Sequence, residues 1–556
     1  MECALSDWLQ HQPICRLSGL LIDKMELDQE AVSSSEHSDP VRPWTERIVV
    51  RFGTTFIANI FRAALSFASG VLIARALGAS NFGDFSFLLG SFAAISQLLD
   101  LGTSSAFYTF ISQRRRSRAF LALYTAWMGF QFGLTVLFLA LLLPGKMIQL
   151  IWVGHDRWIV LLAFASSFFM TQVWGMVSQL GEATRRTVFI QLTSVAQAVA
   201  HLALIAIMIR WGLLTVRVVM WLLLGEYLLL AILLGPRLLR WNLTEQSNKD
   251  VGYLTIFKEF SVYCAPLVVY GWANFLYMFA DRWLLQRYGG SEQQGFFAVG
   301  QQIANISLIA TSSVLRVFWK EVAEAHNRQN HARVQKLYMS VSRSLYFVGA
   351  AISCLFIPYT REVLIRTVGI GYERGWLCLA LMLLLPIHQS LGQIQGTFFY
   401  ASANTKSYTK IGLLIMGVSI PVTYFVLAPR SSALGGLGLG AVGMAIKLVV
   451  LQIIAVNLQA YVLARANHWS YDYDYQAIVL LTLFSLGWLC KWVSGALLGL
   501  AGSASSPIGM MALSSFLYSA LLATMLYIKP GVAGMTRGEA MHIVSDTARW
   551  LRSARV

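Results

Sequence analysis

Long runs of apolar residues, separated by short polar breaks, recur along the chain from residue 52 to residue 528. A helix of ~20 apolar residues crosses the ~30 Å hydrocarbon core of a bilayer. The pattern therefore predicts about fourteen membrane-spanning helices. We place them near residues 52–76, 82–108, 119–143, 159–180, 188–209, 216–235, 260–284, 295–318, 339–365, 376–398, 411–428, 439–463, 477–500 and 508–528.

Two of the polar breaks resemble each other. Gly78-Ala-Ser-Asn-Phe-Gly83 joins predicted spans one and two, and Gly290-Ser-Glu-Gln-Gln-Gly295 joins spans seven and eight, 212 residues later. Both pairs of spans cross in the same direction, so we expect two related six-helix bundles about an axis along the membrane normal. The predicted domains are a cytosolic, disordered extension at 1–47, bundles at 48–240 and 241–465, two additional transmembrane helices at 466–528 and a cytosolic tail at 529–556.

Composition agrees with this pattern. Of 556 residues, 56% are hydrophobic and 13% are charged, which is far more apolar than a soluble protein. The expected fold class is an all-α polytopic membrane protein. Six scattered cysteines without a CxxC pair indicate neither a disulfide framework nor a metal site.

The net charge of +16 is spread over loops, where a positive-inside bias explains it better than nucleic-acid binding. If the N-terminus is inside, the cytoplasmic loops are rich in Lys and Arg and the opposite loops are poor in them. This asymmetry predicts that both termini are cytoplasmic. The cytoplasmic loops then include Arg114, Arg115, Arg116, Arg118, Arg185, Arg186, Lys320, Arg328, Lys406 and Lys410.

Spans one and two each carry a charge deep inside, Arg62 and Asp100. A charge there is costly and is expected to face protein or water. Arg62 shares a helical face with Asn59. One interpretation is a structural Arg62–Asp100 ion pair, and the other is that the planar guanidinium of Arg62 binds an anionic group of a substrate.

Spans seven and eight each carry a polar stripe at helical spacing. Aromatic, amide and hydroxyl groups suit a path for sugars, although hydrogen bonding between packed helices would produce the same stripes. The stripe residues are Tyr270, Asn274, Tyr277 and Asp281 on span seven, and Gln301, Asn305, Ser312 and Arg316 on span eight. Arg282 follows Asp281 at the outer end of span seven, where one interpretation is that its charged group only extends to the membrane interface.

Other ionisable residues lie inside predicted spans. Lys447, in span twelve, has no carboxylate one turn away, so either a distant acid pairs with it or it faces an aqueous cavity, and we favour the cavity. Glu226 and His388 are candidates for a proton relay, although packing residues of these types are common. His201 and Lys491 are the other buried titratable groups.

Several short motifs resemble a known family in their order and spacing. They are Val71-Leu-Ile-Ala-Arg-Ala-Leu-Gly78 with Phe82-Gly-Asp-Phe85, Leu99-Asp-Leu-Gly102, Ala280-Asp-Arg-Trp-Leu-Leu285 and Tyr400-Ala-Ser-Ala-Asn-Thr-Lys406. Over roughly residues 50 to 465 the chain resembles the oligosaccharide flippases of the Wzx type, in the polysaccharide biosynthesis protein family of the MOP exporter superfamily.

The resemblance implies translocation of undecaprenyl-pyrophosphate-linked oligosaccharide units across the bacterial inner membrane by alternating access. With this substrate, the anionic group that Arg62 would bind is the pyrophosphate. The resemblance implies no cofactor. The partners expected are the lipid-linked oligosaccharide, membrane lipids, and a polysaccharide polymerase and chain-length regulator, with no nucleic acid.

Two other functions compete with this hypothesis. A MATE-like exporter of small cations needs acids to predominate in its cavity, whereas Arg62, Arg316 and Lys447 make this one cationic. A membrane enzyme of polysaccharide assembly needs long loops with clustered His, Asp or Arg residues, and the loops predicted outside are short. Because catalytic motifs are missing as well, we expect a transporter and not an enzyme.

Overall fold

The computed structural model describes residues 44–113, 116–184, 186–242, 252–308, 322, 331–402, 404–467, 469, 471, 473–500, 507–535 and 537–538. The chain forms two compact units, residues 1–54 and 55–556. Helix α3 begins at the end of the first unit, and all other described residues belong to the second. Within the described ranges every regular element is a helix.

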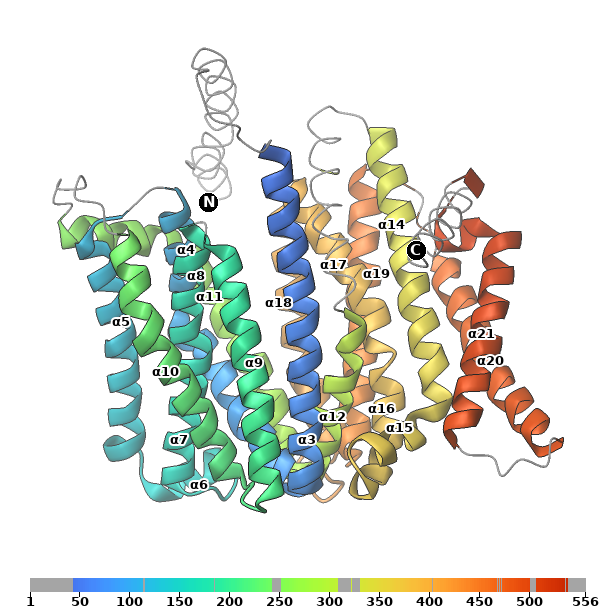
Figure 1. Ribbon diagram of the computed structural model, residues 1–556, viewed down its shortest axis with the longest axis horizontal. Helices are drawn as coiled ribbons and strands as arrows, with labels where there is room; N and C mark the ends of the chain where they lie inside the picture. Colours follow the sequence, from blue (N-terminus) through green and yellow to red (C-terminus); the bar gives the residue numbers. More distant parts are fainter. Residues whose placement is uncertain are drawn as a thin grey trace, which may run out of the picture. The chain divides into compact units, whose positions relative to one another are not determined.

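Figure 1 shows how the described helices are arranged. In chain order they are α3 (Trp44–Asp100), α4 (Thr103–Gln113), α5 (Arg118–Leu137), η1 (Phe138–Leu142), α6 (Gly145–Ile151), α7 (Arg157–Phe168), η2 (Phe169–Val173), α8 (Trp174–Ala183), α9 (Thr187–Arg210), α10 (Val216–Asn242), α11 (Tyr253–Leu284), η3 (Leu285–Gly289), α12 (Gly290–Ala304), α14 (His331–Phe356), η4 (Ile357–Tyr359), α15 (Thr360–Thr367), η5 (Ile370–Gly375), α16 (Trp376–Met382), α17 (Leu385–Ala401), α18 (Thr405–Leu427), α19 (Gly440–Asn467), α20 (Tyr473–Leu500), α21 (Pro507–Ile528) and η6 (Pro530–Ala533).

Twelve helical segments in the described ranges are long and apolar enough to cross a membrane. Two of them, Ala58–Asp100 and Tyr253–Leu308, hold 43 and 56 residues. At ~1.5 Å per residue they are about 65 and about 84 Å long, which is more than twice the ~30 Å thickness of a bilayer core, so each holds more than one span and we count two in each. The predicted all-α polytopic fold with about fourteen spans is therefore confirmed.

A glycine divides each double-length segment. Gly78 has φ 73° and ψ 170°, and Gly290 has φ 79° and ψ 176°. This backbone region is essentially restricted to glycine, because a Cβ atom would collide with the neighbouring peptide. The sequence repeat thus corresponds to two turns of the same conformation.

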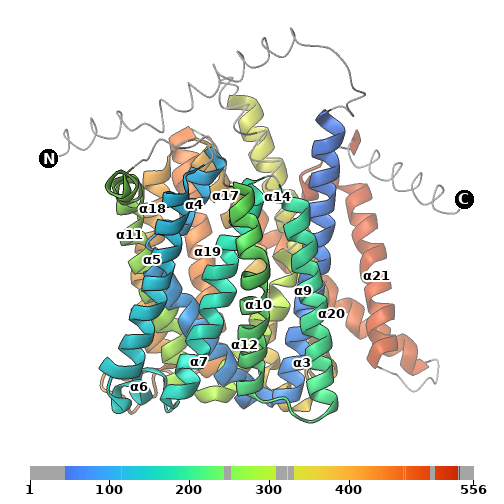
Figure 2. The same cartoon turned by 60° about the vertical axis from the view of Figure 1, so that its left-hand side comes forward.

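The helices lie side by side and run broadly parallel or antiparallel to one another (Figure 2). Aromatic side chains fill the core of the first half, where the rings of Phe107 and Tyr124 stack with centroids 4.0 Å apart. A second core joins residues from both halves of the sequence, including Leu77, Phe82 and Phe296. The division into two six-helix bundles stays a prediction.

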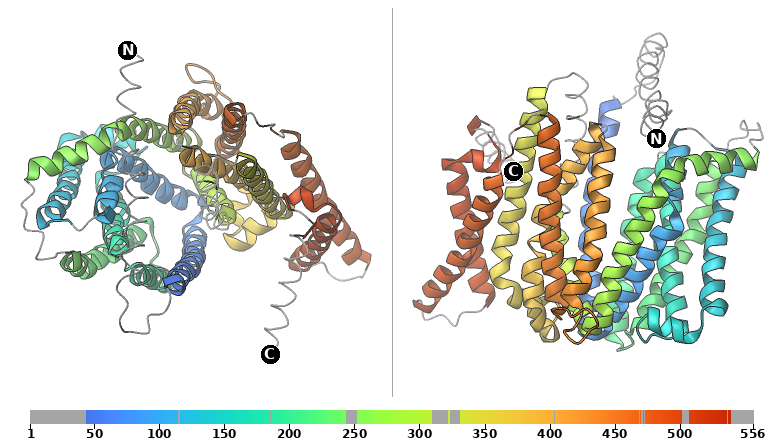
Figure 3. Two further views of the ribbon diagram at one scale, coloured as in Figure 1. Left: turned by 90° about the horizontal axis from the view of Figure 1, so that it is seen from above. Right: turned by 180° about the vertical axis from the view of Figure 1, so that it is seen from behind.

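The last two long helices lie at one edge of this unit (Figure 3). Helix α20 packs against α14 and against α21. Gly487 of α20 leaves room for the backbone of Cys354, since a Cβ at Gly487 would meet that carbonyl oxygen. These additional helices are therefore tightly joined to the rest of the unit.

Candidate functional site

Beside the Gly78 turn, Asp84 lies 3.5 Å from His155, which follows α6, and Arg75 contacts the Arg366 carbonyl of α15. Ser291, beside the Gly290 turn, donates a hydrogen bond to the same Asp84. Both turns therefore lie near α6 and α15, and we call this end, where Figure 1 shows α6 and α15, the turn end.

Immediately after the turns, α3 and α12 approach at backbone distance. A Cβ added to Gly83 would meet the carbonyl of Ser291, and one added to Gly295 would meet the carbonyl of Ala79. We call Ala79, Gly83, Ser291 and Gly295 the crossing.

The crossing is reciprocal. With the 212-residue offset of the repeat, Ala79 corresponds to Ser291 and Gly83 corresponds to Gly295. Gly83 contacts Ser291, and the matching residue Gly295 contacts Ala79, which matches Ser291. Exchanging the two halves therefore reproduces the same contact, as happens across a two-fold axis. The spacing small-xxx-small on both helices permits this close approach inside a membrane.

Polar side chains surround the crossing. Asp84 Oδ1 accepts hydrogen bonds from Gln286 Nε2 at 3.0 Å and from Ser291 Oγ at 2.5 Å. His155 Nε2, from the connection before α7, lies 3.5 Å from the same oxygen. A single carboxylate thus connects side chains from both halves of the sequence.

More contacts join the two halves of the sequence. Tyr372 donates a hydrogen bond to the carbonyl of Ala74 at 2.9 Å. The guanidinium of Arg282 lies against Gly90, where a side chain would collide with it. Further contacts are Arg75 Nη1 to the Arg366 carbonyl at 3.3 Å, Arg282 Nη1 to the Ser86 carbonyl at 3.4 Å, and Gln302 Nε2 to the Phe67 carbonyl at 3.3 Å.

Near the end of α11, before the Gly290 turn, the chain carries a buried ion pair. Lys447 Nζ donates to Asp281 Oδ1 at 2.7 Å and to Oδ2 at 2.6 Å, and Thr423 Oγ1 donates to Oδ1 at 2.7 Å. The ring of Tyr277 covers the ammonium at 4.9 Å from its centroid. The side chains of Lys447 and Asp281 are 0% and 8% exposed. The preference for a cavity-facing Lys447 was therefore wrong: a distant acid neutralises it.

In the described first half of the sequence, the two charged residues predicted inside spans do not form an ion pair with each other. Asp100 caps α4, accepting from the Ser104 amide at 2.9 Å, from Ser104 Oγ at 2.9 Å and from Thr103 Oγ1 at 3.3 Å. Arg62 is exposed and Asn59 is half-buried. Within the described ranges Arg62 and Asp100 form no ion pair, so the structural pairing considered for them does not occur.

Glu226 belongs to a cluster between α9 and α10. Its carboxylate oxygens lie 3.0 and 3.1 Å from His201 Nδ1, and Gln197 Nε2 donates to it at 2.9 Å. The next residue, Tyr227, interacts electrostatically with both Glu226 and Arg62. Arg62 and this cluster are consequently neighbours, although sequence spacing gave no sign of it.

The remaining predicted residues differ in exposure and in partners. Tyr270 and Asn305 are exposed, whereas Asn274, Tyr277 and Gln301 are half-buried, and Arg316 and Ser312 lie outside the described residues. His388 is buried against Tyr346, with ring centroids 5.6 Å apart, and neither ring nitrogen finds a hydrogen-bond partner within the described ranges. Lys491 pairs with Glu362 at 3.0 Å.

Opposite the turn end, the start of α11 packs on α4 and α5. Arg116 forms a two-pronged salt bridge with Glu259, with both N–O distances 2.9 Å, and the hydroxyls of Thr109 and Tyr263 lie 3.2 Å apart. Arg116, which the charge asymmetry predicts to lie in a cytoplasmic loop, therefore contacts helix α11.

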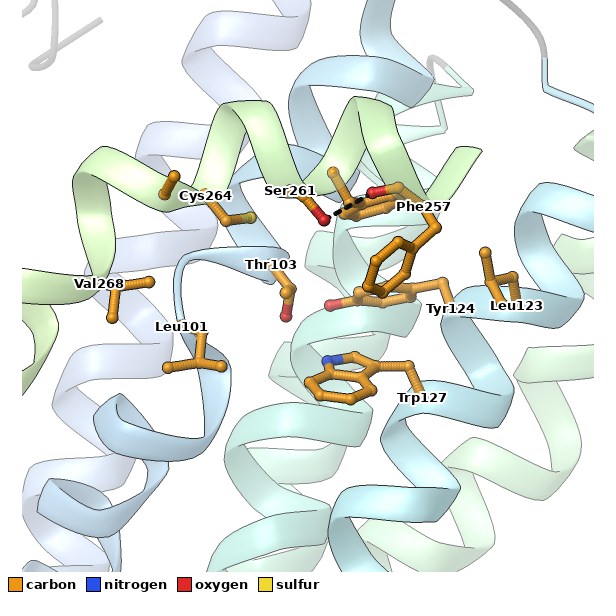
Figure 4. A pocket seen from close by; sticks show the side chains of 11 residues that line it. Leu101, Thr103, Leu123, Tyr124, Trp127, Phe257, Ser261, Cys264 and Val268 are labelled. Atoms are coloured by element: carbon orange, nitrogen blue, oxygen red, sulfur yellow. Dashed lines mark hydrogen bonds between the residues drawn. The ribbon is translucent and has the colours of Figure 1, made fainter. Parts of the chain in front are cut away.

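An apolar pocket of about 330 Å³ lies between α4, α5 and α11 (Figure 4). Tyr124 directs its hydroxyl toward Thr103, and the indole of Trp127 lies beside them (Figure 4). Trp127 Nε1 is buried without a hydrogen-bond partner in the described part of the chain. Such a pocket suits an apolar chain or ring that carries one acceptor.

Sequence reasoning missed several of these residues. Asp84 lies in the Phe82-Gly-Asp-Phe85 motif, so the motif could have identified it. The turn repeat aligns Ala79 with Ser291 and could have identified the crossing. For Gln286, Gln302 and Thr423 the sequence carries no comparable signal, because the contacts described above join them to residues more than 140 positions away.

Comparisons with known proteins agree with this architecture. The family model for polysaccharide biosynthesis proteins matches residues 50–319. A structure of the lipid II flippase MurJ in an inward closed conformation has a TM-score of 0.64 at 12% identity, covering 85% of this chain and 99% of that one. An inward-facing multidrug resistance MATE transporter of the MOP superfamily has a TM-score of 0.56 at 13% identity, covering 74% and 96%.

A MOP superfamily transporter from Pyrococcus furiosus has a TM-score of 0.50 at 13% identity, covering 76% of this chain and 96% of that one. No curated protein sequence matches the chain. The resemblance expected from the short motifs is confirmed by the family match and by the shared fold.

Proposed function

We propose that the protein is a flippase for lipid-linked oligosaccharides. The chain matches the family model for polysaccharide biosynthesis proteins over residues 50–319, and its fold is that of MOP superfamily transporters. It moves an undecaprenyl-pyrophosphate-linked repeat unit from the inner to the outer leaflet by alternating access. The observation that carries this proposal is the reciprocal crossing, which brings α3 and α12 into backbone contact directly after two repeated turns.

The crossing behaves as a gate in this proposal. Small residues and a few hydrogen bonds hold α3 and α12 together, and none of those hydrogen bonds links two full charges. A contact of this kind separates at a modest cost, because each hydrogen bond contributes only about 0.5–1.5 kcal/mol net. Two halves related by a pseudo-two-fold axis can then rock about the membrane midplane.

Substrate contacts are assigned by chemistry. Arg62, exposed inside a span, offers its planar fork to the pyrophosphate. Tyr270, Asn274, Gln301 and Asn305 remain candidates for the sugar path. The apolar pocket beside Trp127 receives part of the isoprenoid chain, for which its lining is suited.

Glu226 and His388 remain proton-relay candidates. Glu226 is the better placed, because its hydrogen-bonded partner His201 can share a proton with it and Arg62 lies nearby. His388 lacks a neighbour of that kind in the described ranges. The same function implies a polysaccharide polymerase and a chain-length regulator as partners.

The proposed location is the bacterial inner membrane with both termini cytoplasmic, so the turn end faces outward. Single cysteines replacing Ser80 and Glu292 should react with a membrane-impermeant maleimide on intact spheroplasts. Labelling of only one of them would contradict parallel repeats, and labelling of neither would reverse the orientation.

Transport itself is tested with purified protein in proteoliposomes that hold a fluorescent undecaprenyl-pyrophosphate oligosaccharide. The proposal predicts that a glycosidase added outside the proteoliposomes reaches all of the lipid-linked oligosaccharide, because the protein moves it from the inner leaflet to the outer one. In protein-free liposomes about half of the lipid stays in the inner leaflet and is protected. Efflux of a small organic cation without movement of the lipid would favour a MATE-like exporter instead. Cleavage or extension of the glycan would indicate an enzyme.

A further inference from the structure

A second pocket lies at the turn end, away from the crossing. It has a volume of about 610 Å³ and is formed by η4, α15, η5 and the start of α16 on one side and by α20 on the other. Two tryptophans, Trp376 and Trp488, line it and are 44% and 47% exposed. Its volume lies within the range of small-molecule sites, about 300–1,000 Å³.

Charged side chains line the same pocket in fixed positions. Lys491 reaches from α20 to Glu362 and to the Pro358 carbonyl, and its ammonium lies 4.6 Å from the ring centroid of Tyr359. Arg361 forms a salt bridge with Glu373 across the pocket wall. These pairs hold donors and acceptors in place without a ligand.

The charge in the pocket does not cancel. Lys491 and Arg361 are matched by Glu362 and Glu373, whereas Arg374 is exposed and forms no ion pair within the described ranges. The lining therefore carries one surplus positive charge. An anionic group on a bound molecule would complete the set.

We propose that this pocket binds a saccharide unit that carries a carboxylate, such as a uronic acid. A half-exposed tryptophan offers an apolar face to the C–H side of a sugar ring, while its surroundings supply hydrogen bonds. Fixed ion pairs present both donors and acceptors to ring hydroxyls, and Arg374 binds the carboxylate. The inference rests on the proposed function, since the pocket would receive the glycan after it crosses the membrane.

The pocket also gives a role to the additional helices. Without α20, Trp488 and Lys491 would be missing, and the pocket would lose its second wall. Helix α21 packs on α20 and so supports that wall from behind. The two helices beyond the predicted repeat complete a binding site at the turn end.

Binding is measured by saturation-transfer NMR on the purified full-length protein, so no transport is needed. The probe is a tetrasaccharide of alternating glucuronic acid and N-acetylglucosamine, and maltotetraose is the neutral comparison. Wild type should give signals from the acidic tetrasaccharide and much weaker ones from maltotetraose. Absence of signal from the acidic probe, or equal signals from both, would overturn the proposal.

Matched variants locate the site. Trp488→Ala should weaken binding about tenfold or more, as truncation of an anchoring tryptophan typically does. Trp492→Ala, one turn further along α20 and 72% exposed but outside the lining, should bind like wild type. Equal losses in both variants would contradict the assignment.

The exposed Arg374 provides a variant with little risk to folding. Arg374→Gln should lose preference for the acidic probe, and Arg430→Gln, exposed in the connection before α19, should retain it. Competition by inorganic pyrophosphate at the saccharide's own concentration would show that the pocket recognises an anion and not a sugar, which overturns the proposal.

The binding and transport measurements can fail separately. If the lipid is transported while no saccharide binds, only the pocket assignment fails. If saccharide binds while the lipid is not transported, only the proposed function fails.

Discussion

The two halves of the sequence place charge inside the membrane in opposite ways. In the second half, Lys447 and Asp281 neutralise each other behind Thr423 and Tyr277, and both are almost fully enclosed. In the first half, Arg62 is exposed and forms no ion pair in the described ranges, while Glu226 is paired only with a histidine. The charges of the Lys447–Asp281 pair are therefore buried and matched, whereas, among the described residues, Arg62 in the first half is exposed and unmatched.

This difference separates architecture from binding. A buried, matched pair has no charge left for a substrate, so we expect it to hold α11 against α18 and α19. An unmatched guanidinium inside a membrane span is costly unless it meets water or an anion. The first half is therefore expected to supply the cationic contact, although sequence reasoning had assigned that property to Lys447 as well.

The largest effect is expected at the sealed pair. Lys447→Met leaves the Asp281 carboxylate buried without its partner, which costs about 3–5 kcal/mol of unfolding free energy. Membrane levels should drop, and the apparent melting temperature of the purified protein should fall. Lys146→Met, at an exposed lysine, is the control and should melt like wild type.

The double variant Asp281→Asn with Lys447→Met removes both charges and should recover most of the lost stability. Transport should recover with it if the pair is architectural. A double variant that is stable yet inactive would contradict this interpretation and would assign the pair a role in transport.

The crossing should show the next largest effect. Gly83→Ala places a Cβ against the Ser291 carbonyl and pushes α3 from α12, at a cost of about 1–3 kcal/mol typical of overpacking. Gly129→Ala in α5 adds the same methyl group where no atom lies within 4 Å. Thermal unfolding should therefore separate the two variants, and equal melting temperatures would argue against a close crossing.

The sequence predicted the spans well because the bilayer imposes length and apolarity locally. It missed α6 and α15, of 7 and 8 residues, because helices this short leave no periodic apolar signal. It missed the pairing of Lys447 with Asp281 because these residues are 166 positions apart, and helical spacing reports only neighbours within a few turns.

Asp100 illustrates a different failure. Its depth in an apolar run suggested an ion pair, yet the chain breaks at Leu101 and Gly102, both with positive φ, and Asp100 caps the next helix. Leu99-Asp-Leu-Gly102 followed by Thr103 and Ser104 is a helix-start pattern that local reasoning could have recognised. Capping, and not charge pairing, explains this residue.

Arg62 should affect transport more than stability. Arg62→Lys retains the charge but loses the planar fork, and a hydrogen bond to a charged group contributes about 1.5–3 kcal/mol, so transport should fall about tenfold or more. The melting temperature should stay near that of wild type because Arg62 is exposed. Arg210→Lys, at the exposed end of α9, should leave both properties unchanged, and a transport rate preserved in Arg62→Lys would exclude the pyrophosphate role.

At Glu226 the expected loss of stability is smaller than at the ion pair or at the crossing. Glu226→Gln retains hydrogen-bonding capacity toward His201 and Gln197, so the loss should be about 0.5–1.5 kcal/mol. If the pair relays protons, transport driven by an imposed pH gradient should drop while transport without the gradient persists. An unchanged response to the gradient would remove Glu226 from the relay.

The central claim is that the turn end must open for transport. Asp84→Cys combined with Ser291→Cys places two thiols where the wild-type side chains meet at 2.5 Å, within reach of a short bis-methanethiosulfonate cross-linker. Each variant that carries only one of the two substitutions, treated with the same reagent, is the control. Cross-linked protein in proteoliposomes should stop moving the lipid-linked oligosaccharide and should resume after reduction, whereas transport at the untreated rate with the cross-link intact would contradict the account.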